Sequence, residues 1–589
     1  MRFAKSGRLS KIKERSFCIR GVPLSRLSGL AALSAALFFS LASYAQQSAA
    51  HVILTPTEDH ISGSVYVSLD SWIYPAMERL HALGYLDTAF LGLRPWTRLS
   101  CLHMLEQSQA NIFDGSDSPG NLEARQLFNS LAQEFSDHRD AFDPSRSNAH
   151  AEVDRLYERT MYIGGRPIND SSHFGSTIIN DYGRAYEGGF NGLTGFSARA
   201  EDARLSLNVR GEFQHAPGRA AYPLSVRQAI AGIDQAPLLP AIPVATTDEF
   251  RLIDANLSYH ILNHEISVGK SENWWGPSEG GSFAWSNNAE PIYALRINRV
   301  EPLEIPLLSK FLGPFRYDNL FGSLKGHRYP NAPWVYAQKI SFKPTPNLEF
   351  GFSRITVFAG EGHVPLTFGT FVHSFFSFQN VPPSEKLSTR DPGARHSSFD
   401  FNYRLPYLRN WVTLYSDSII HDDVSPVDAP RHAAINPGVY ISHFPGAPHL
   451  DFRAEAVSTD PPTSRSIGGT FLYWEAVYKD VYTNKGYIFG NWIGREGKGG
   501  QAWLTWWLSP QERIQLSYRN AKSAKDFVPG GTTQNLIAAN AILRVKHDVE
   551  VNALAQYERW TVPVLAPGQK SDFTTSVQVT WFPHLRAGN

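Results

Sequence analysis

Residues 513–519 read Arg-Ile-Gln-Leu-Ser-Tyr-Arg, a strict alternation of polar and apolar side chains. The same alternation returns along the C-terminal three-quarters of the chain, in Ile253–Ile261, Phe399–Leu405, Leu450–Ala456 and Phe573–Trp581. A period of two residues places alternate side chains on opposite faces of a β-strand. Because the polar face carries Arg, Asp and Glu as well as uncharged residues, the pattern predicts a transmembrane β-barrel with lipid outside and water inside.

The chain begins with a basic segment followed by the apolar run Leu27–Leu41. This run is shorter than the ~20 residues that a membrane-spanning helix needs, which disfavours the alternative of an uncleaved anchor. Ser43-Tyr44-Ala45 supplies small residues at the cleavage positions, so we predict a signal peptide over residues 1–45, cut after Ala45. Cys18 precedes the apolar run, and therefore no lipoprotein signal is indicated.

Removal of this leader changes the charge of the protein. The whole chain has 55 basic and 55 acidic residues, and eight of the basic residues but only Glu14 among the acidic ones lie in the leader. The resulting excess of acidic groups argues against a nucleic-acid-binding protein, which would be basic. Cys101 is the single cysteine after residue 45, so no intramolecular disulfide can form, and its apolar helical surroundings predict an ordinary buried thiol.

Residues 46–148 lack the alternation and predict a small periplasmic α-helical domain. Apolar side chains recur at helical spacing, Ser68 or Asp70 can cap the first helix, and Gly84 can end it. The three predicted helices cover Trp72–Leu83, Thr97–Gln109 and Asn121–Phe135.

Residues 149–589 predict the barrel. Two tight hairpins turn at Leu262-Asn263-His264 and at Lys546-His547-Asp548, which indicates antiparallel neighbours. Longer polar connections are predicted over Ala216–Thr247, Glu301–Ala332, Val381–His396 and Val424–Pro437. Short turns at one end and long loops at the other are typical of outer-membrane barrels, and about 430 residues accommodate about 16–18 strands.

Other all-β folds fit less well. A β-propeller would show a repeat of about 40–50 residues, and none is visible. A β-sandwich would bury apolar side chains on both inner faces, whereas the polar faces here carry charges. Past the leader, no apolar segment has the length of a helical membrane span.

Residues 271–291 interrupt the alternation directly after a predicted strand. Flat aromatic rings can stack on sugars, while Asn, Ser and Glu give directional hydrogen bonds to hydroxyl groups. The candidate carbohydrate-binding residues are therefore Trp274, Trp275, Glu279, Trp285, Asn287 and Asn288. The alternative is an interfacial tryptophan cluster with a Gly-Pro turn, in a plug loop folded into the lumen.

This stretch resembles the Wzi family of outer-membrane capsule-assembly proteins, through Trp274–Pro277 followed by Ser286-Asn287-Asn288-Ala289-Glu290-Pro291. Trp72–Pro75 and Arg94–Arg98 resemble the small periplasmic domain of such proteins. The resemblance implies an 18-stranded barrel in the outer membrane of a Gram-negative cell. It also implies a lectin-like, non-enzymatic role in which capsular or other surface polysaccharide is held or organised.

Two alternatives from other functional classes stay open. Charged lumen faces are compatible with a porin-like diffusion channel, and a membrane-embedded hydrolase of glycan or lipid is compatible with the location. No zinc-protease, Cys/His or Gly-x-Ser-x-Gly motif is present, so we expect no metal, cofactor or catalytic site. His421-Asp422-Asp423 is a possible metal or acid site, with a solvated loop as the simpler interpretation.

The polar strand faces and the last strand suggest partners. Arg453, Arg513 and Arg519 could meet uronic-acid carboxylates, or could pair across the lumen with Asp451 or Glu455. Trp581-Phe582 resembles the signal that the barrel-insertion machinery reads. The expected partners are surface polysaccharide, outer-membrane lipid and this machinery, for a protein that we expect to be monomeric.

Overall fold

The computed structural model describes residues 62–115, 118–136, 148–377, 381–386, 388–422, 432–462, 469–583 and 585–588. The predicted leader, its cleavage site and Asp423 lie outside the described residues.

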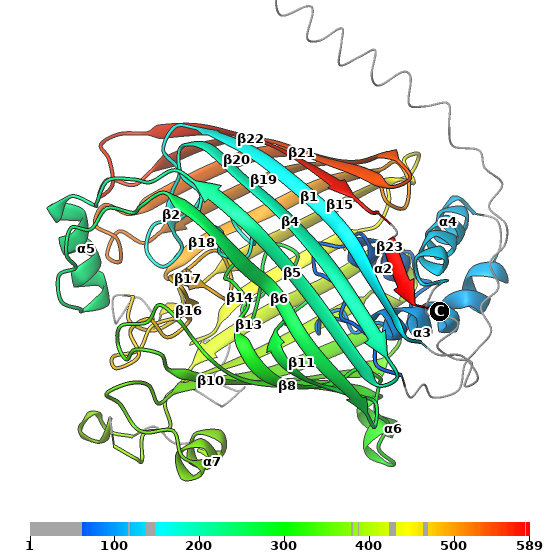
Figure 1. Cartoon of the computed structure of the whole chain (residues 1–589), viewed down its shortest axis with the longest axis horizontal. Helices are drawn as coiled ribbons and strands as arrows, with labels where there is room; N and C mark the ends of the chain where they lie inside the picture. The colour runs from blue at the N-terminus through cyan, green and yellow to red at the C-terminus, as the bar shows by residue number, and fades with distance from the viewer. Residues whose placement is uncertain are drawn as a thin grey trace, which may run out of the picture. The chain divides into compact units, whose positions relative to one another are not determined.

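A single antiparallel sheet of 19 strands closes on itself (Figure 1). Strand β1 (His150–Gly164) pairs with β4 (Gly189–Asp202) on one side and with β22 (Lys570–Trp581) on the other. Because β23 (Leu585–Gly588) continues the line of β22 along β1, 18 strands surround the lumen. The predicted closed barrel of about 18 antiparallel strands is therefore confirmed.

The remaining strands of the wall follow one another in chain order, each antiparallel to its neighbours. They are β5 (Leu205–Ala216), β6 (Thr247–Ile261), β7 (His264–Lys270), β8 (Tyr293–Arg299), β9 (Phe315–Ser323), β10 (Trp334–Thr345), β11 (Leu348–Phe358), β12 (Ala394–Arg404), β13 (Val412–His421), β14 (Ala434–Ile441), β15 (Leu450–Ser458), β18 (Gly497–Trp507), β19 (Arg513–Ser523), β20 (Thr532–Lys546) and β21 (Val549–Thr561).

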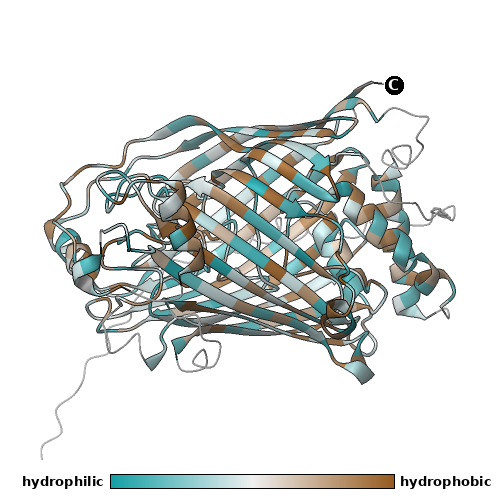
Figure 2. Cartoon of the chain, turned by 90° about the horizontal axis from the view of Figure 1, so that it is seen from below, coloured by the Kyte–Doolittle hydropathy of each residue, from teal (hydrophilic) through white to brown (hydrophobic). Residues whose placement is uncertain are grey.

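The alternation of the sequence becomes the two faces of this wall, which Figure 2 shows as alternating hydrophobic and hydrophilic bands along the strands. In β5, Leu207 and Phe213 are exposed on the outside, whereas Arg210 and Glu212 are 2% and 0% exposed on the lumen side. The outside of a membrane barrel meets lipid, so these exposed apolar residues are accounted for without a further protein surface.

Two-residue turns join several pairs of neighbouring strands at one end of the barrel. Leu262 and Asn263 both have positive φ, 49° and 60°, as tight hairpin turns of the primed type require. His547-Asp548 also joins β20 and β21 with two residues, but neither has positive φ and the pairing register shifts between Arg544 and Lys546. Both predicted hairpins are confirmed, with turns one residue shorter than expected. In outer-membrane barrels the short turns face the periplasm and the long loops face the cell exterior.

One predicted loop was wrong. Strand β9 lies within Glu301–Ala332, which the sequence analysis assigned to a polar connection. Inward Arg316 and Asp318 alternate in it with outward Phe315 and Tyr317, but nine residues after a Gly-Pro pair gave too short a signal to recognise. The predicted C-terminal boundaries of the loops ending at His396 and Pro437 were also a few residues too late, since β12 starts at Ala394 and β14 at Ala434.

Three helices confirm the predicted N-terminal helical region: α2 (Ile73–Ala82), α3 (Arg98–Phe113) and α4 (Pro119–Glu134). Thr97 caps α3, since the Ser100 amide donates to its hydroxyl at 3.1 Å. Gly84 closes α2 with a φ of +90°. The predicted cap of α2 was wrong, because neither Ser68 nor Asp70 caps it and Asp70 pairs instead with arginines of the wall.

The three helices pack around an apolar cluster of their own, in which Met77, Leu102 and Phe128 are fully buried. Cys101 belongs to this cluster and is fully buried, which confirms the prediction of a buried thiol, and this burial raises the pKa of the thiol to about 12. The helices also contact the barrel: Arg79 of α2 donates to the carbonyls of Ser442 and Pro448.

Shorter elements decorate the loops. These are α5 (Leu224–Asp234), α6 (Leu308–Leu312), α7 (Phe368–Phe376), the 3₁₀ turns Pro383–Glu385 and Pro406–Leu408, and the small strand pairs β2 (Asn169–Asp170) with β3 (Gly175–Ser176) and β16 (Thr483–Asn484) with β17 (Tyr487–Ile488). Among the described residues, no helix is both long enough and apolar enough to cross a membrane.

Candidate functional site

The segment 271–292, here called the lumenal insert, leaves the wall between β7 and β8 and enters the barrel. Carboxylates of the wall hold its main chain. Asp417 of β13 accepts from the Phe283 amide at 2.6 Å, and Glu455 of β15 accepts from the amide of Glu279 at 2.6 Å. Charged residues on the inner strand faces thus position a loop inside the lumen.

The three predicted tryptophans form the buried centre of this insert. Trp274, Trp275 and Trp285 are 7%, 0% and 3% exposed. The ring centroid of Trp285 lies 5.9 Å from that of Trp275 and 4.5 Å from that of Phe489, which belongs to the loop between β15 and β18. Protein therefore covers the ring faces that the sequence analysis offered to sugars, and the arrangement matches the plug-loop alternative.

The two predicted asparagines tie the insert to loops from the long-loop end. Asn288 accepts from the Asn180 amide at 3.1 Å and donates to the carbonyl of Ile488 at 2.8 Å. The main-chain carbonyl of Asn287 accepts from the Tyr182 amide at 2.7 Å. These contacts use the hydrogen-bonding capacity of Asn288 within the protein.

The Trp-Trp-Gly-Pro motif needs its glycine. Gly276 has a φ of +148°, and a Cβ atom at this position would lie 2.8 Å from the Oδ2 atom of Asp417 and closer still to Ser282. Glycine has no such atom, so the turn can pass directly beside the wall. The motif is explained by close packing inside the barrel.

An ion-pair cluster around Glu290 fixes the far end of the insert. Arg251 of β6 lies 2.7 Å from one carboxylate oxygen and Lys485 of the loop between β15 and β18 lies 2.9 Å from it, while Lys270 contacts the other oxygen. Sequence reasoning missed this cluster, because its members come from distant segments and no local pattern connects them.

Glu279 is the most exposed of the six predicted site residues. Glu279 retains 42% of its side-chain exposure and lines a space of about 190 Å³, here called the lumenal cavity. The wall residues of this cavity combine aromatic, hydroxyl, amide and charged groups: Tyr440, Asp451, Arg453, Trp503, Thr505, Trp507, Arg513, Gln515 and Asn540. The six predicted residues therefore do not form one exposed surface.

The three arginines singled out in the sequence have different surroundings. Arg453 pairs with Glu279 at 2.6 Å and with Glu78 of α2 at 3.0 Å, not with Asp451 or Glu455. Arg519 donates to the main-chain carbonyls of residues 176 and 177. Arg513 lies 5.8 Å from the Trp507 ring centroid, and no carboxylate in the described part of the chain lies within ion-pair distance of it.

A second and larger cavity of about 580 Å³ adjoins the first at Asp70 and Ser71. It lies at the short-turn end, between the starts of α2 and β1 and the turn around His547. Its arginines are paired: Arg155 with Asp70 at 2.7 Å and Arg199 with Glu152 at 2.6 Å. The charges of this larger cavity are therefore balanced by neighbours.

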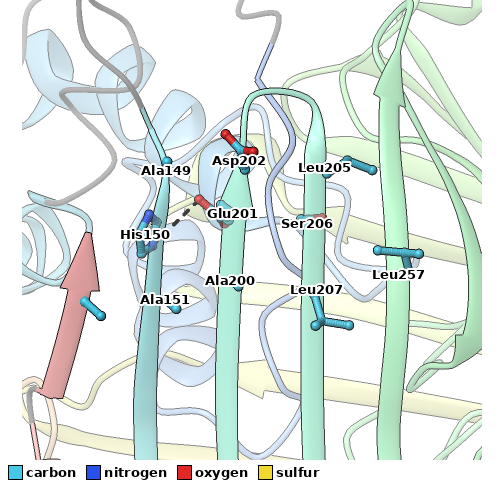
Figure 3. A pocket seen from close by; sticks show the side chains of 11 residues that line it. Ala149, His150, Ala151, Ala200, Glu201, Asp202, Leu205, Ser206, Leu207 and Leu257 are labelled. Atoms are coloured by element: carbon cyan, nitrogen blue, oxygen red, sulfur yellow. Dashed lines mark ion pairs between the residues drawn. The ribbon is translucent and has the colours of Figure 1, made fainter. Parts of the chain in front are cut away.

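A third depression of about 450 Å³ lies on the wall at the start of β1 (Figure 3). Small residues such as Ala151 and Ala200 form its floor, and Leu207 and Leu257 are exposed beside it. His150 and Glu201, 4.0 Å apart, point to the other side of the wall. This depression faces lipid and offers no converging polar groups.

The possible site at His421 has few ligands. The His421 ring stacks on that of His396 with centroids 4.5 Å apart, and its Nε2 atom lies 3.8 Å from Asp422. No group of three or more His, Cys, Asp or Glu side chains arranged for a metal ion occurs among the described residues.

Comparison with known proteins gives three findings. A sequence model of the family described as "Capsule assembly protein Wzi" matches residues 158–575. An uncharacterised 55.8 kDa protein of the cps region of Klebsiella pneumoniae is 26% identical over 166 residues, which cover 28% of this chain. The match spans 31% of the length of that relative.

A solved structure of Wzi resembles the whole fold. That protein is described as an outer-membrane protein involved in group 1 capsule assembly in Escherichia coli and as a carbohydrate-binding β-barrel. It superimposes with a TM-score of 0.63 at 17% sequence identity, over 89% of this chain and 100% of that chain.

Proposed function

Because this chain belongs to the Wzi family of capsule assembly proteins, we propose that it binds and organises capsular or other surface polysaccharide at the outer membrane, without catalysis. The similar barrel from Escherichia coli, described as carbohydrate-binding, supports this proposal. The protein is exported by a signal peptide cleaved after Ala45, inserted with the help of its terminal aromatic residues, and monomeric. Residues 46–148 form the periplasmic part and residues 149–589 the barrel.

The lumenal cavity is the observation that carries the proposal, and its position beside the larger cavity means that the proposed contact with polysaccharide is at the short-turn end of the lumen. Trp503 and Trp507 of β18 point into it, next to the amides of Gln515 and Asn540. Aromatic rings beside amide groups suit a sugar ring, whose faces stack and whose hydroxyls exchange hydrogen bonds. Glu279 is the predicted site residue that contacts the sugar, while Trp274, Trp275, Trp285, Asn287 and Asn288 hold the insert that positions Glu279.

Arg513 offers an acidic sugar a cation without an ion-pair partner among the described residues, in a cavity that Asp70, Glu78, Glu279 and Asp451 also line. A guanidinium group that no carboxylate pairs directly can donate two parallel hydrogen bonds to the carboxylate of a uronic acid. Charge-assisted hydrogen bonds of this kind contribute about 1.5–3 kcal/mol, enough to favour an acidic over a neutral polysaccharide by about tenfold or more.

Binding of polygalacturonate and of neutral dextran to the purified protein in detergent tests this proposal. We expect Arg513→Gln to weaken polygalacturonate binding about tenfold, and Trp503→Ala to weaken binding by a smaller factor. Trp506→Ala is the matched control, because Trp506 lies on the lipid side of the same strand with 51% exposure. Unchanged affinity in both cavity variants would show that the cavity is not the binding site.

Two further variants separate direct from indirect roles. Trp274→Ala and Trp275→Ala remove buried residues of the insert, so we expect them to weaken binding together with a loss of thermal stability. A loss of affinity with unchanged stability would instead place these rings in contact with sugar. Release of product from polysaccharide or phospholipid by the purified protein would revive the hydrolase alternative.

A further inference from the structure

Helix α7 lies on the outer face of the barrel, at the long-loop end (Figure 1). The ring of Phe371 packs edge-on against Phe321 of β9 and Tyr336 of β10, with centroids 5.6 Å apart in both cases. Tyr336 faces outwards, since its strand neighbours Val335 and Ala337 are fully buried on the lumen side. The helix is thus attached to the wall on the side that faces lipid.

Both ends of α7 are fixed. The Thr367 hydroxyl accepts from the Thr370 amide at 3.1 Å in a capping box at the start. Arg354 of β11 donates to the carbonyl of Ser377 at 2.6 Å at the end. Phe375 also packs on Tyr336 of the wall, with ring centroids 5.0 Å apart, whereas Phe368 and Phe376 remain 84% and 63% exposed.

Helix α6 occupies the matching position at the short-turn end. It belongs to the connection between β8 and β9, and Leu303 and Phe315 close this connection with two main-chain hydrogen bonds of 2.9 and 3.0 Å. Leu307 and Phe311 are 70% and 80% exposed. Figure 1 shows α6 and α7 on the same side of the barrel, at opposite ends of the same strands.

The strands between the two helices carry an aromatic group at each end. Phe315, Phe342 and Phe350 lie side by side near α6, with ring centroids 5.8 and 5.3 Å apart. Phe321 and Trp334 stack at 4.9 Å beneath α7. Such aromatic girdles mark the two membrane–water interfaces of outer-membrane barrels.

The spacing fits a membrane. Strand β10 has 12 residues. At about 3.3 Å per residue it is about 40 Å long, and a tilt of about 40° leaves about 30 Å along the membrane normal. The apolar band of outer-membrane barrels is about 25 Å tall, so β10 spans this band and reaches the interface at both ends. The two helices consequently lie at the two boundaries of this band.

We propose that α6 and α7 are membrane-interface anchors that insert Leu307 and Phe311 into the inner leaflet, and Phe368 and Phe376 into the outer leaflet, of the lipid around β9–β11. Lipid acyl chains cover these apolar side chains, because the helices continue the lipid-facing surface of the wall and because so exposed an apolar patch is unfavourable in water. Because one anchor lies at each membrane interface beside β9–β11, the pair resists tilting of the barrel in the membrane. The inference is independent of polysaccharide binding.

Single-cysteine variants carrying a spin label test the proposal in vesicles of phosphatidylethanolamine and phosphatidylglycerol. Cys101→Ala provides the background, and Phe376→Cys, Phe368→Cys and Phe311→Cys report on the anchors. Val268→Cys, at a position with 63% exposure on the outer face of β7, is the lipid reference. Arg390→Cys, in the same loop as α7 with 75% side-chain exposure, is the water reference.

We expect the ratio of collision rates with oxygen and with a soluble nickel chelate at the anchor positions to match that at position 268 and to exceed that at position 390 several-fold. Using two positions on α7 keeps the test valid if one variant fails to fold. A ratio equal to that at position 390 would overturn the proposal. So would dipolar broadening between labels of two molecules, since a second copy of the chain would then be the occupant.

Discussion

Arg94 and Trp274 exchange two main-chain hydrogen bonds, 3.0 Å from the Arg94 nitrogen to the Trp274 oxygen and 3.1 Å in the reverse direction. One residue precedes α3 and the other begins the lumenal insert, so the helical region and the insert are joined inside the barrel. Glu349 of the wall adds to this junction by accepting from the amides of Leu91 and Gly92 at 2.8 and 3.0 Å.

Loss of Trp275 tests the insert as a structural centre. Replacing a fully buried aromatic residue with alanine leaves a cavity, and we expect Trp275→Ala to reduce the free energy of unfolding by about 3–5 kcal/mol. The measurement is the temperature at which the folded band is lost in heat-modifiability gels. Trp506→Ala, on the exposed outer face, should leave this temperature nearly unchanged; equal shifts in the two variants would contradict the assignment.

Removal of Arg79 tests how α2 is held. The fully buried guanidinium lies 2.6 Å from Glu123 and 3.7 Å from Asp451, so Arg79→Ala leaves buried carboxylates without their counter-ion. We expect a loss of about 3–5 kcal/mol and faster proteolysis of residues 62–136. Arg390→Ala breaks an exposed pair with Glu385 and should cost at most about 1 kcal/mol. Similar effects of the two variants would refute this role.

The ion pairs of the loop residue His173 predict that the stability of helix α5, at the long-loop end, depends on pH. Its ring contacts Asp170 and Asp234, both at 2.9 Å, and Asp234 belongs to α5. Burial opposes the charged ring, but the two carboxylates outweigh it and raise the pKa of His173 to about 10. Because the folded-state pKa lies above the usual 6.5, the stabilisation is complete below about pH 6.5 and is lost as the pH rises through 10.

We therefore expect hydrogen exchange in α5 to accelerate between about pH 7 and pH 10 in the native protein, beyond the intrinsic rise. In His173→Gln, α5 should already exchange fast at pH 7 and show little further change. Arg495, which lies 2.6 Å from Asp234, remains as a second contact in both proteins and keeps α5 attached. Identical profiles of the two proteins would argue against the titration of His173.

The last strand of the wall should be indispensable. β22 pairs with both β21 and β1, so deletion of residues 573–589 exposes two strand edges to lipid, where their amides find no hydrogen-bond partners. We expect no heat-modifiable barrel from this truncated chain. Deletion of residues 585–589 alone removes β23 and should still allow insertion. A stable barrel from the longer deletion would disprove the prediction.

The filled lumen predicts low ion flow. Apolar residues from the wall, such as Val335 and Ile355, join Trp275, Phe283 and Tyr482 in one cluster across the interior. We expect no large, steady conductance steps in planar bilayers, in contrast to an open porin. Replacing residues 272–291 with a short Gly-Ser linker should raise the conductance. Large steps from the native protein would favour the diffusion-channel alternative.

Much of the wall could be predicted because strand periodicity is local. In strands such as β5 and β19, consecutive residues alternate between the lumen side and the lipid side, so the sequence itself shows the strand. The short turns after β6 and β20 are visible as the interruption between two such strands. The predicted helix boundaries lay close to the observed ones for the same reason, since Thr97 caps α3 through a contact with a residue only three positions away. Strand β9 escaped because nine residues between a Gly-Pro pair and a further loop give little periodic signal.

The interior could not be predicted in the same way. In the sequence, Trp285 looks the same whether its ring contacts a sugar or Phe489, and only the fold decides which contact forms. The cavity residues Trp503 and Arg513 were visible as inward positions of their strands, but nothing local brings them beside Glu279. Contacts of this kind depend on closure of the whole wall.

The lumenal insert is anchored below by Arg94 and above by the loop that carries Phe489, with strands on every side. We therefore expect this segment to take up its position before β22 pairs with β1, or at the same time as that pairing closes the barrel.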